Sequence, residues 1–155
     1  MVNEKHISLS ESQTILLGEE FAKKLKSGDT VAISGDLGTG KTEFIKGICR
    51  YFKIDEIVTS PTFSIINQYH AHSGKGDFPI YHIDLYRISK AEELENIGFS
   101  ECVHSDKGIK LIEWAENANG SSPDYTYKVS ILADDENEDM RHIKVEYQIS
   151  EEEHA

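Results

Sequence analysis

The sequence predicts an α/β sandwich of three layers around a mixed, mostly parallel central sheet. Two patterns indicate this class. Early in the chain, short β-branched and apolar runs alternate with helical stretches, as is typical of strands joined by crossover helices. Late in the chain, two apolar runs are joined only by an acidic turn over residues 134–139, which predicts a C-terminal hairpin.

Two helices are predicted from capping signals. Ser10 and Gln13 have capping-box spacing, and apolar residues then recur at helical intervals until Gly28. Ser89 and Glu92 repeat the capping-box spacing and predict a short helix that ends before Gly98.

The strands are predicted from short β-branched and apolar runs. They comprise residues 30–34, 57–58, 63–69, 80–85, 110–113, 129–133 and 143–149. The stretch 70–79 carries Gly, Ser and Pro without periodicity, so we expect a mobile loop there.

Length and composition indicate one compact domain. The 155 residues are 38% hydrophobic, which suits a single core over residues 1–150, followed by an acidic tail over 151–155. Affinity for phosphate backbones comes mainly from Lys and Arg, so the formal net charge of −12 argues against nucleic-acid binding by the domain itself. We therefore expect no DNA partner, and any RNA to be held by another protein.

The sequence also favours a soluble, cytoplasmic protein. No stretch approaches the roughly 20 consecutive apolar residues that a membrane span needs, and the first residues lack the apolar core of a secretory signal. Cys49 and Cys102 lie far apart without a metal-binding or redox spacing, which fits a reducing compartment.

The most specific motif is GDLGTGKT at residues 35–42, which matches the Walker A pattern G-x-x-x-x-G-K-[ST]. It lies where the strand 30–34 ends and a helix with apolar residues on one face begins, the context expected of a P-loop NTPase-like fold. The motif predicts a phosphate cradle for ATP or ADP formed by Gly35, Asp36, Leu37, Gly38, Thr39, Gly40, Lys41 and Thr42. Lys41 would place its charge between the β- and γ-phosphates, and Thr42 would bind Mg²⁺.

A P-loop site also needs an acidic group at the end of a neighbouring strand. Asp84 ends the run 80–84, and Glu113 ends the run 110–113. One carboxylate would ligate Mg²⁺ and the other would orient the attacking water, and the residues alone leave the assignment open. Thr62, in the segment Ser60-Pro61-Thr62, is a candidate sensor of the γ-phosphate.

These motifs together resemble the TsaE (YjeE) family, bacterial ATPases of tRNA threonylcarbamoyladenosine synthesis. The segments that carry the resemblance are GDLGTGKTEF at 35, SPTF at 60, YHIDLYR at 81, EELENIGF at 92 and LIEW at 111. They span nearly the whole chain, and their combination is more specific than the Walker A motif alone.

The resemblance implies roles for the individual residues of the site. Thr42 and Glu113 are expected to ligate Mg²⁺, while Asp84 takes a catalytic Walker-B-like role, with Lys41 also catalytic. Thr62 is expected on a switch-like loop.

The resemblance also implies the nucleotide contacts and the partners. Residues of the first helix and the late hairpin approach the base, here near Glu11, Thr14 and Arg141. ATP hydrolysis is expected to be slow alone and coupled to a complex of TsaB and TsaD, in which TsaD modifies adenosine 37 of tRNA. This chain would then meet tRNA only indirectly, in agreement with its charge.

Three other functions are compatible with a Walker A motif. A small-molecule kinase would need an acceptor pocket and usually an arginine-rich lid, whereas the chain has only Arg50, Arg87 and Arg141. A GTPase is disfavoured because no NKxD-like or DxxG segment is present. A module in which ATP only orders a surface for a partner would need no turnover.

Overall fold

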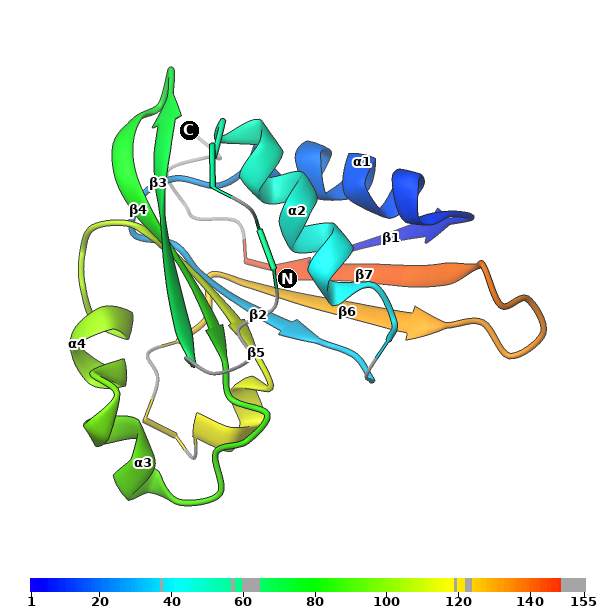
Figure 1. The fold of residues 1–155 in the computed structure, drawn as a ribbon. Helices are drawn as coiled ribbons and strands as arrows, with labels where there is room; N and C mark the ends of the chain where they lie inside the picture. Colours follow the sequence, from blue (N-terminus) through cyan, green and yellow to red (C-terminus); the bar gives the residue numbers. More distant parts are fainter. Residues whose placement is uncertain (37, 57, 60–64, 119, 122–123, 149–155) are drawn as a thin grey trace.

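The structure is a computed structural model that describes residues 1–36, 38–56, 58–59, 65–118, 120–121 and 124–148. Its strands form one seven-stranded sheet in the order β1-β7-β6-β2-β5-β4-β3 (Figure 1). The strands are β1 (Val2–Ser8), β2 (Thr30–Ser34), β3 (Ile66–Ser73), β4 (Gly76–Asp84), β5 (Ile109–Glu113), β6 (Tyr127–Ala133) and β7 (Arg141–Tyr147).

The sheet is mixed, with its parallel strands in the centre. β2 pairs in parallel with β5 and β6, and β4 pairs in parallel with β5. The pairs β1–β7, β6–β7 and β3–β4 are antiparallel. The α/β class and the C-terminal hairpin are confirmed, but only half of the pairings between the described strands are parallel. The expectation of a mostly parallel sheet missed the antiparallel strands at both margins.

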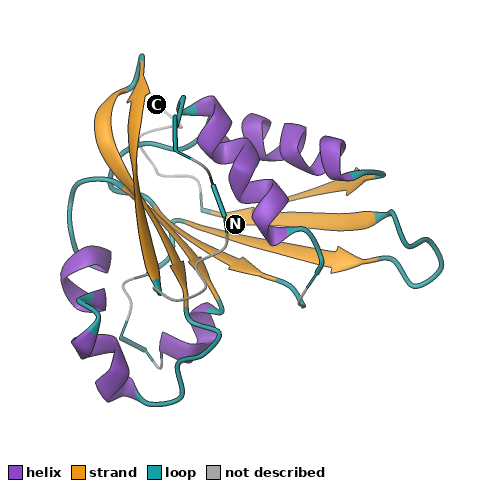
Figure 2. Cartoon of the chain, viewed as in Figure 1, coloured by secondary structure: helices purple, strands orange, loops and turns teal. Residues whose placement is uncertain are grey.

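Helices cover the sheet on both sides and create the three predicted layers (Figure 2). α1 (Glu11–Ala22) and α2 (Lys41–Tyr51) pack together on one side, while α3 (Ala91–Asn96), α4 (Phe99–Val103) and the 3₁₀ turn η1 (Ala115–Ala118) accompany the other. Successive side chains of β5 point to opposite faces of the sheet, and each face has its own apolar core. Leu111 packs in the core under α1 and α2, and Ile112 packs in the core under α3 and α4. No helix among the described residues has the length and apolar character needed to cross a bilayer.

Half of the first predicted capping box is present. Ser10 Oγ accepts a hydrogen bond from the Gln13 backbone N–H at 3.1 Å, which satisfies an N–H group that a helix start otherwise leaves unpaired. Gln13 Oε1 accepts instead from the N–H of Leu9, the residue before the N-cap, at 2.7 Å. The capping box predicted at Ser89 is wrong: α3 has Lys90 at its N-cap, and the Ser89 hydroxyl donates to Glu93 Oε1 at 3.0 Å instead.

The loop predicted over 70–79 is instead the end of a long hairpin formed by β3 and β4. Ala71 and Phe78 are cross-strand partners and both are buried, so the alternation of a strand persists through this polar stretch. At the turn, Lys75 Nζ donates to the Lys23 carbonyl at 2.6 Å, near the C-terminal end of α1. Gly, Ser and Pro concealed this pattern in the sequence.

Three elements escaped prediction, namely β1, α4 and η1. β1 is an edge strand with mostly exposed side chains, while α4 and η1 are single short turns, so none of them has a strong periodic signal. Val58 lies outside any strand, while Ile57 and the predicted acidic tail over 151–155 are outside the described residues.

α1 and α2 meet at two glycines. A Cβ on Gly18 would lie 2.2 Å from the Phe44 carbonyl oxygen, and a Cβ on Gly47 would lie 1.9 Å from the Ile15 carbonyl oxygen. Only glycine allows such an approach of two helix backbones. The contact fixes how closely α2, and with it the preceding glycine loop, lies against α1.

We predict that Gly47→Ala lowers the free energy of unfolding by about 1–3 kcal/mol, because overpacking outweighs the gain in helix propensity. Gly74→Ala in the β3–β4 turn is the control, since a Cβ there would meet nothing within 4 Å. Urea denaturation measures both variants. Equal stability of Gly47→Ala and the control would contradict this account of the helix contact.

Candidate functional site

The glycine loop connects β2 to α2 at the carboxyl end of the parallel strands. Gly38 and Gly40 have φ values of 79° and 105°, and Gly40 is the N-cap of α2. A Cβ on Gly35 would lie 2.4 Å from the Ile131 carbonyl oxygen of β6. All three glycines of the motif therefore have a positive φ, and Gly35, with a φ of 150°, also permits a close approach to a strand.

Polar contacts hold the loop in shape. The Thr39 hydroxyl donates to the Asp36 carbonyl at 2.8 Å, and Arg141 Nε donates to the Thr39 carbonyl at 3.0 Å. Arg141 thus joins the late hairpin to the glycine loop. Leu37 lies outside the described residues.

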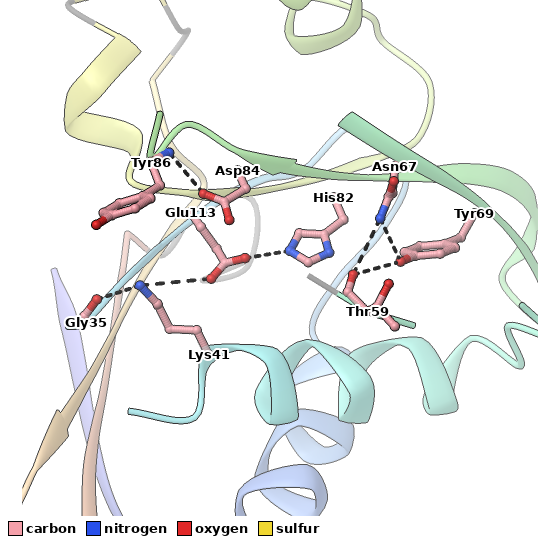
Figure 3. A network of polar contacts seen from close by, with 9 residues as sticks. All are labelled: Gly35, Lys41, Thr59, Asn67, Tyr69, His82, Asp84, Tyr86 and Glu113. Atoms are coloured by element: carbon pink, nitrogen blue, oxygen red, sulfur yellow. Dashed lines mark hydrogen bonds and ion pairs between the residues drawn. The ribbon is translucent and has the colours of Figure 1, made fainter. Parts of the chain in front are cut away.

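Lys41 is buried at the first position of α2. Its Nζ donates to the Gly35 carbonyl at 2.6 Å and lies 4.0 Å from Glu113 Oε1 (Figure 3). The same ammonium lies 4.3 Å from the centroid of the Trp114 ring. Lys41 and Glu113, 72 positions apart in the sequence, therefore form a buried ion pair beneath the glycine loop.

Strand register brings the two predicted carboxylates together. Asp84 of β4 and Glu113 of β5 are register partners at the ends of two parallel strands, and Ile33 of β2 is the partner of Glu113 on its other side. Glu113 is only 3% exposed. Burial raises the pKa of Asp84, and the neighbouring negative charge of Glu113 raises it further, although the Tyr86 N–H donates to this carboxylate at 3.0 Å.

One polar residue of the site was missed by the sequence analysis. His82, wholly buried on β4, places Nε2 2.7 Å from Glu113 Oε2. It lies two positions before Asp84 on the same strand and therefore on the same face. That spacing within an otherwise apolar strand was the available signal, but the partner on β5 required the register.

The predicted residues border two adjoining clefts. One, of about 400 Å³, is lined by Lys41, Thr42, Asp84 and Glu113 together with Glu11. The other, of about 110 Å³, is lined by Glu11, Thr14, Thr39 and Arg141. A larger open groove of about 990 Å³ lies against β2, β6 and β7 and contains none of the predicted site residues.

The contacts of Thr14 limit what its hydroxyl can do. Thr14 Oγ1 lies 2.7 Å from Ser8 Oγ and donates to the Ser10 carbonyl at 3.2 Å. The side chain is buried, with its methyl group facing Gly40 of the loop. A contact of Thr14 with a base would therefore be apolar.

Thr62 lies outside the described residues, so its predicted role stays a prediction. The described residues next to its segment contact β3 and β4. The Tyr69 hydroxyl donates to the Thr59 carbonyl at 3.3 Å, and the Asp84 N–H donates to the Ile65 carbonyl at 2.9 Å.

A glycine loop between a parallel strand and a helix, with a buried lysine and two carboxylates at adjacent strand ends, defines a P-loop-like α/β protein. The family model described as "Threonylcarbamoyl adenosine biosynthesis protein TsaE" matches residues 8–143. The chain therefore belongs to the TsaE family, whose members take part in tRNA threonylcarbamoyladenosine biosynthesis.

Relatives named tRNA threonylcarbamoyladenosine biosynthesis protein TsaE match most of the chain. The protein of Treponema pallidum (strain Nichols) is 37% identical over 130 residues, 83% of this chain and 92% of its own length. That of Rickettsia bellii (strain RML369-C) is 34% identical over 148 residues, 95% of this chain and 99% of its own length. The crystal structure of Bacillus subtilis YdiB superposes with a TM-score of 0.67 at 28% identity, covering 93% of this chain and 84% of that one.

The raised pKa of Asp84 predicts a stability gain on its neutralisation. A carboxyl whose pKa is raised on folding stabilises the fold only below its unfolded value, here 3.8, and this contribution is lost as the pH rises through the folded value. Asp84→Asn should therefore raise the melting temperature at pH 7 in EDTA without nucleotide, and the gain should shrink as the pH approaches 3.8.

Thermal unfolding of both proteins between pH 3.5 and pH 8 measures this effect. Asp134→Asn is the control, and it should lower the melting temperature at pH 7, because hydrogen bonding to His142 lowers the pKa of Asp134 in the folded protein. A lower melting temperature for Asp84→Asn at pH 7 would contradict the prediction.

Proposed function

We propose that this protein is a magnesium-dependent ATPase that supports a TsaB–TsaD complex in threonylcarbamoyl modification of adenosine 37 in tRNA. The observation that carries the proposal is the convergence of Lys41, Glu113 and Asp84 at the start of α2. Membership of the TsaE family supplies the pathway.

The loop and α2 suit a polyphosphate. The N-terminus of this 11-residue helix presents backbone N–H groups and the positive end of its dipole. Lys41 Nζ donates to the Gly35 carbonyl and lies near Glu113 Oε1, so the ammonium group is already positioned next to the loop that would bind the phosphates. Glu11, Thr14 and Arg141, beside the smaller cleft, are the proposed surroundings of the adenine.

The donor set around the larger cleft fits Mg²⁺. Thr42, Glu113 and Asp84 offer oxygen ligands, which this hard cation prefers. The pKa of Asp84 is raised by burial and by the neighbouring negative charge of Glu113. A divalent cation bound between the two carboxylates would offset their repulsion. No group of three or more His, Cys, Asp or Glu side chains suited to a metal exists in the described part of the chain, so phosphate and water oxygens would complete the coordination.

The roles of the residues then follow from their positions. Thr42 and Glu113 would hold Mg²⁺, which supplies charge neutralisation at the β- and γ-phosphates. Lys41 would stabilise the negative charge that develops on the transferred phosphoryl group. Asp84, less buried than Glu113, would orient the attacking water, and Thr62 would sense the γ-phosphate.

The charge of the chain supports a division of labour with partners. With a net charge of −12, the domain is poorly suited to hold tRNA itself. In the proposal, TsaD transfers the threonylcarbamoyl group to the N6 of adenosine 37, tRNA is bound by the complex in the cytoplasm, and ATP turnover resets the complex between cycles.

Phosphate release from ATP tests the proposal. We predict a low rate for the chain alone and a rise only when TsaB and TsaD are both added. Lys41→Ala should lower the stimulated rate at least about a hundredfold, because it removes a buried transition-state cation. Accumulation of a phosphorylated small molecule, with no response to the two proteins, would instead establish a kinase.

A second experiment separates hydrolysis from binding. Asp84→Asn and Glu113→Gln should still bind ATP through the loop but lose most turnover, and we expect both to lose threonylcarbamoyl transfer in a reconstituted assay with multiple cycles. If modification continues at the wild-type rate while hydrolysis is lost, the chain is an ATP-dependent interaction module.

A further inference from the structure

Glu113 is held from two sides. His82 Nε2 lies 2.7 Å from Oε2, and Lys41 Nζ lies 4.0 Å from Oε1. In Figure 3 the imidazole and the ammonium lie on opposite sides of the carboxylate. Each carboxylate oxygen thus faces a different partner, which fixes the plane of the group as well as its position.

The geometry determines which nitrogen of His82 carries the proton. An ionised carboxylate only accepts hydrogen bonds, so Nε2 must donate to Glu113. Nδ1 is buried and has no hydrogen-bond partner among the described residues. Among the described residues, the hydrogen bond to Glu113 is therefore the one that this buried imidazole makes through its side chain.

A hydrogen-bond donor has a specific consequence at this position. It fixes the orientation of the Glu113 carboxylate at the edge of the larger cleft. Metal-ligating groups commonly depend on such outer hydrogen bonds for their orientation. A histidine with only a packing role would not need its single hydrogen bond to go to this carboxylate.

We propose that His82 is a positioning residue that, as an Nε2–H donor, orients the Glu113 carboxylate for Mg²⁺ and thereby sets metal affinity and turnover. This inference rests on the proposed function, because it assigns His82 a part in the same site. His82 itself, one side chain removed from the cleft, would touch neither metal nor nucleotide.

Two matched variants test the role. In His82→Gln the side-chain amide nitrogen can reach the place of Nε2, whereas in His82→Asn the amide reaches only the place of Nδ1. Both replace the ring by a buried amide, so a general loss of packing should affect them alike.

The readouts are the Mg²⁺ concentration for half-maximal hydrolysis, kcat with TsaB and TsaD, and the melting temperature with ADP in EDTA or in Mg²⁺. His82→Asn should raise the Mg²⁺ requirement or lower kcat by about 10–100-fold, whereas His82→Gln should restore most of the loss. Stabilisation by ADP in EDTA should match that of the wild type in both variants, and the additional stabilisation by Mg²⁺ should fall only in His82→Asn.

A measurement without turnover covers the case in which a variant fails to fold. Nitrogen-15 NMR of the labelled wild-type protein without nucleotide should show a proton on Nε2 of His82. An Nε2 without a proton would overturn the inference, as would equal behaviour of the two variants. If the wild type neither hydrolyses ATP nor gains stability from ADP, the proposed function itself is wrong and this inference falls with it.

Discussion

The buried carboxylate of Glu113 is the constraint on which the site depends. A charge that is only 3% exposed is stable only when it is paired and hydrogen-bonded. Lys41 and His82 meet this requirement from α2 and β4, so one side chain joins three elements far apart in the sequence. Because β2, β5 and β4 run in parallel, their carboxyl ends meet at one edge, where the glycine loop also begins.

The packing of α2 against α1 determines how close Lys41 lies to the carboxyl ends of the parallel strands. α2 rests against α1 through Gly18 and Gly47, where a single added carbon would overlap a backbone carbonyl. A wider separation would shift the first turn of α2 and draw the ammonium away from Glu113. The packing of two glycines, more than 20 residues apart in sequence, thus supports the ion pair at the start of α2.

The parts of the fold with a strong local signal were predictable from the sequence. The glycine loop, its strand and its helix follow from one motif in context, and Asp84 and Glu113 follow from apolar runs that end in a carboxylate. The β3–β4 hairpin was not predictable in the same way, because its buried positions alternate with His70, His72 and Pro79 around a turn that contains Ser and Gly. The His82–Glu113 bond depends on strand register, which no local pattern specifies.

The backbone at Trp114, at the same edge of the sheet, has a strained conformation. This residue directly follows Glu113 and has a φ of 57°, which for a bulky residue costs roughly 1–3 kcal/mol. This turn places the ring 4.3 Å from Lys41 Nζ and 5.1 Å from the half-exposed Tyr86 ring. Tyr86 in turn donates its N–H to Asp84, so the strained tryptophan and its neighbour contact both the lysine and the second carboxylate. The strained backbone at Trp114 therefore lies within the same set of contacts as the charges of the site.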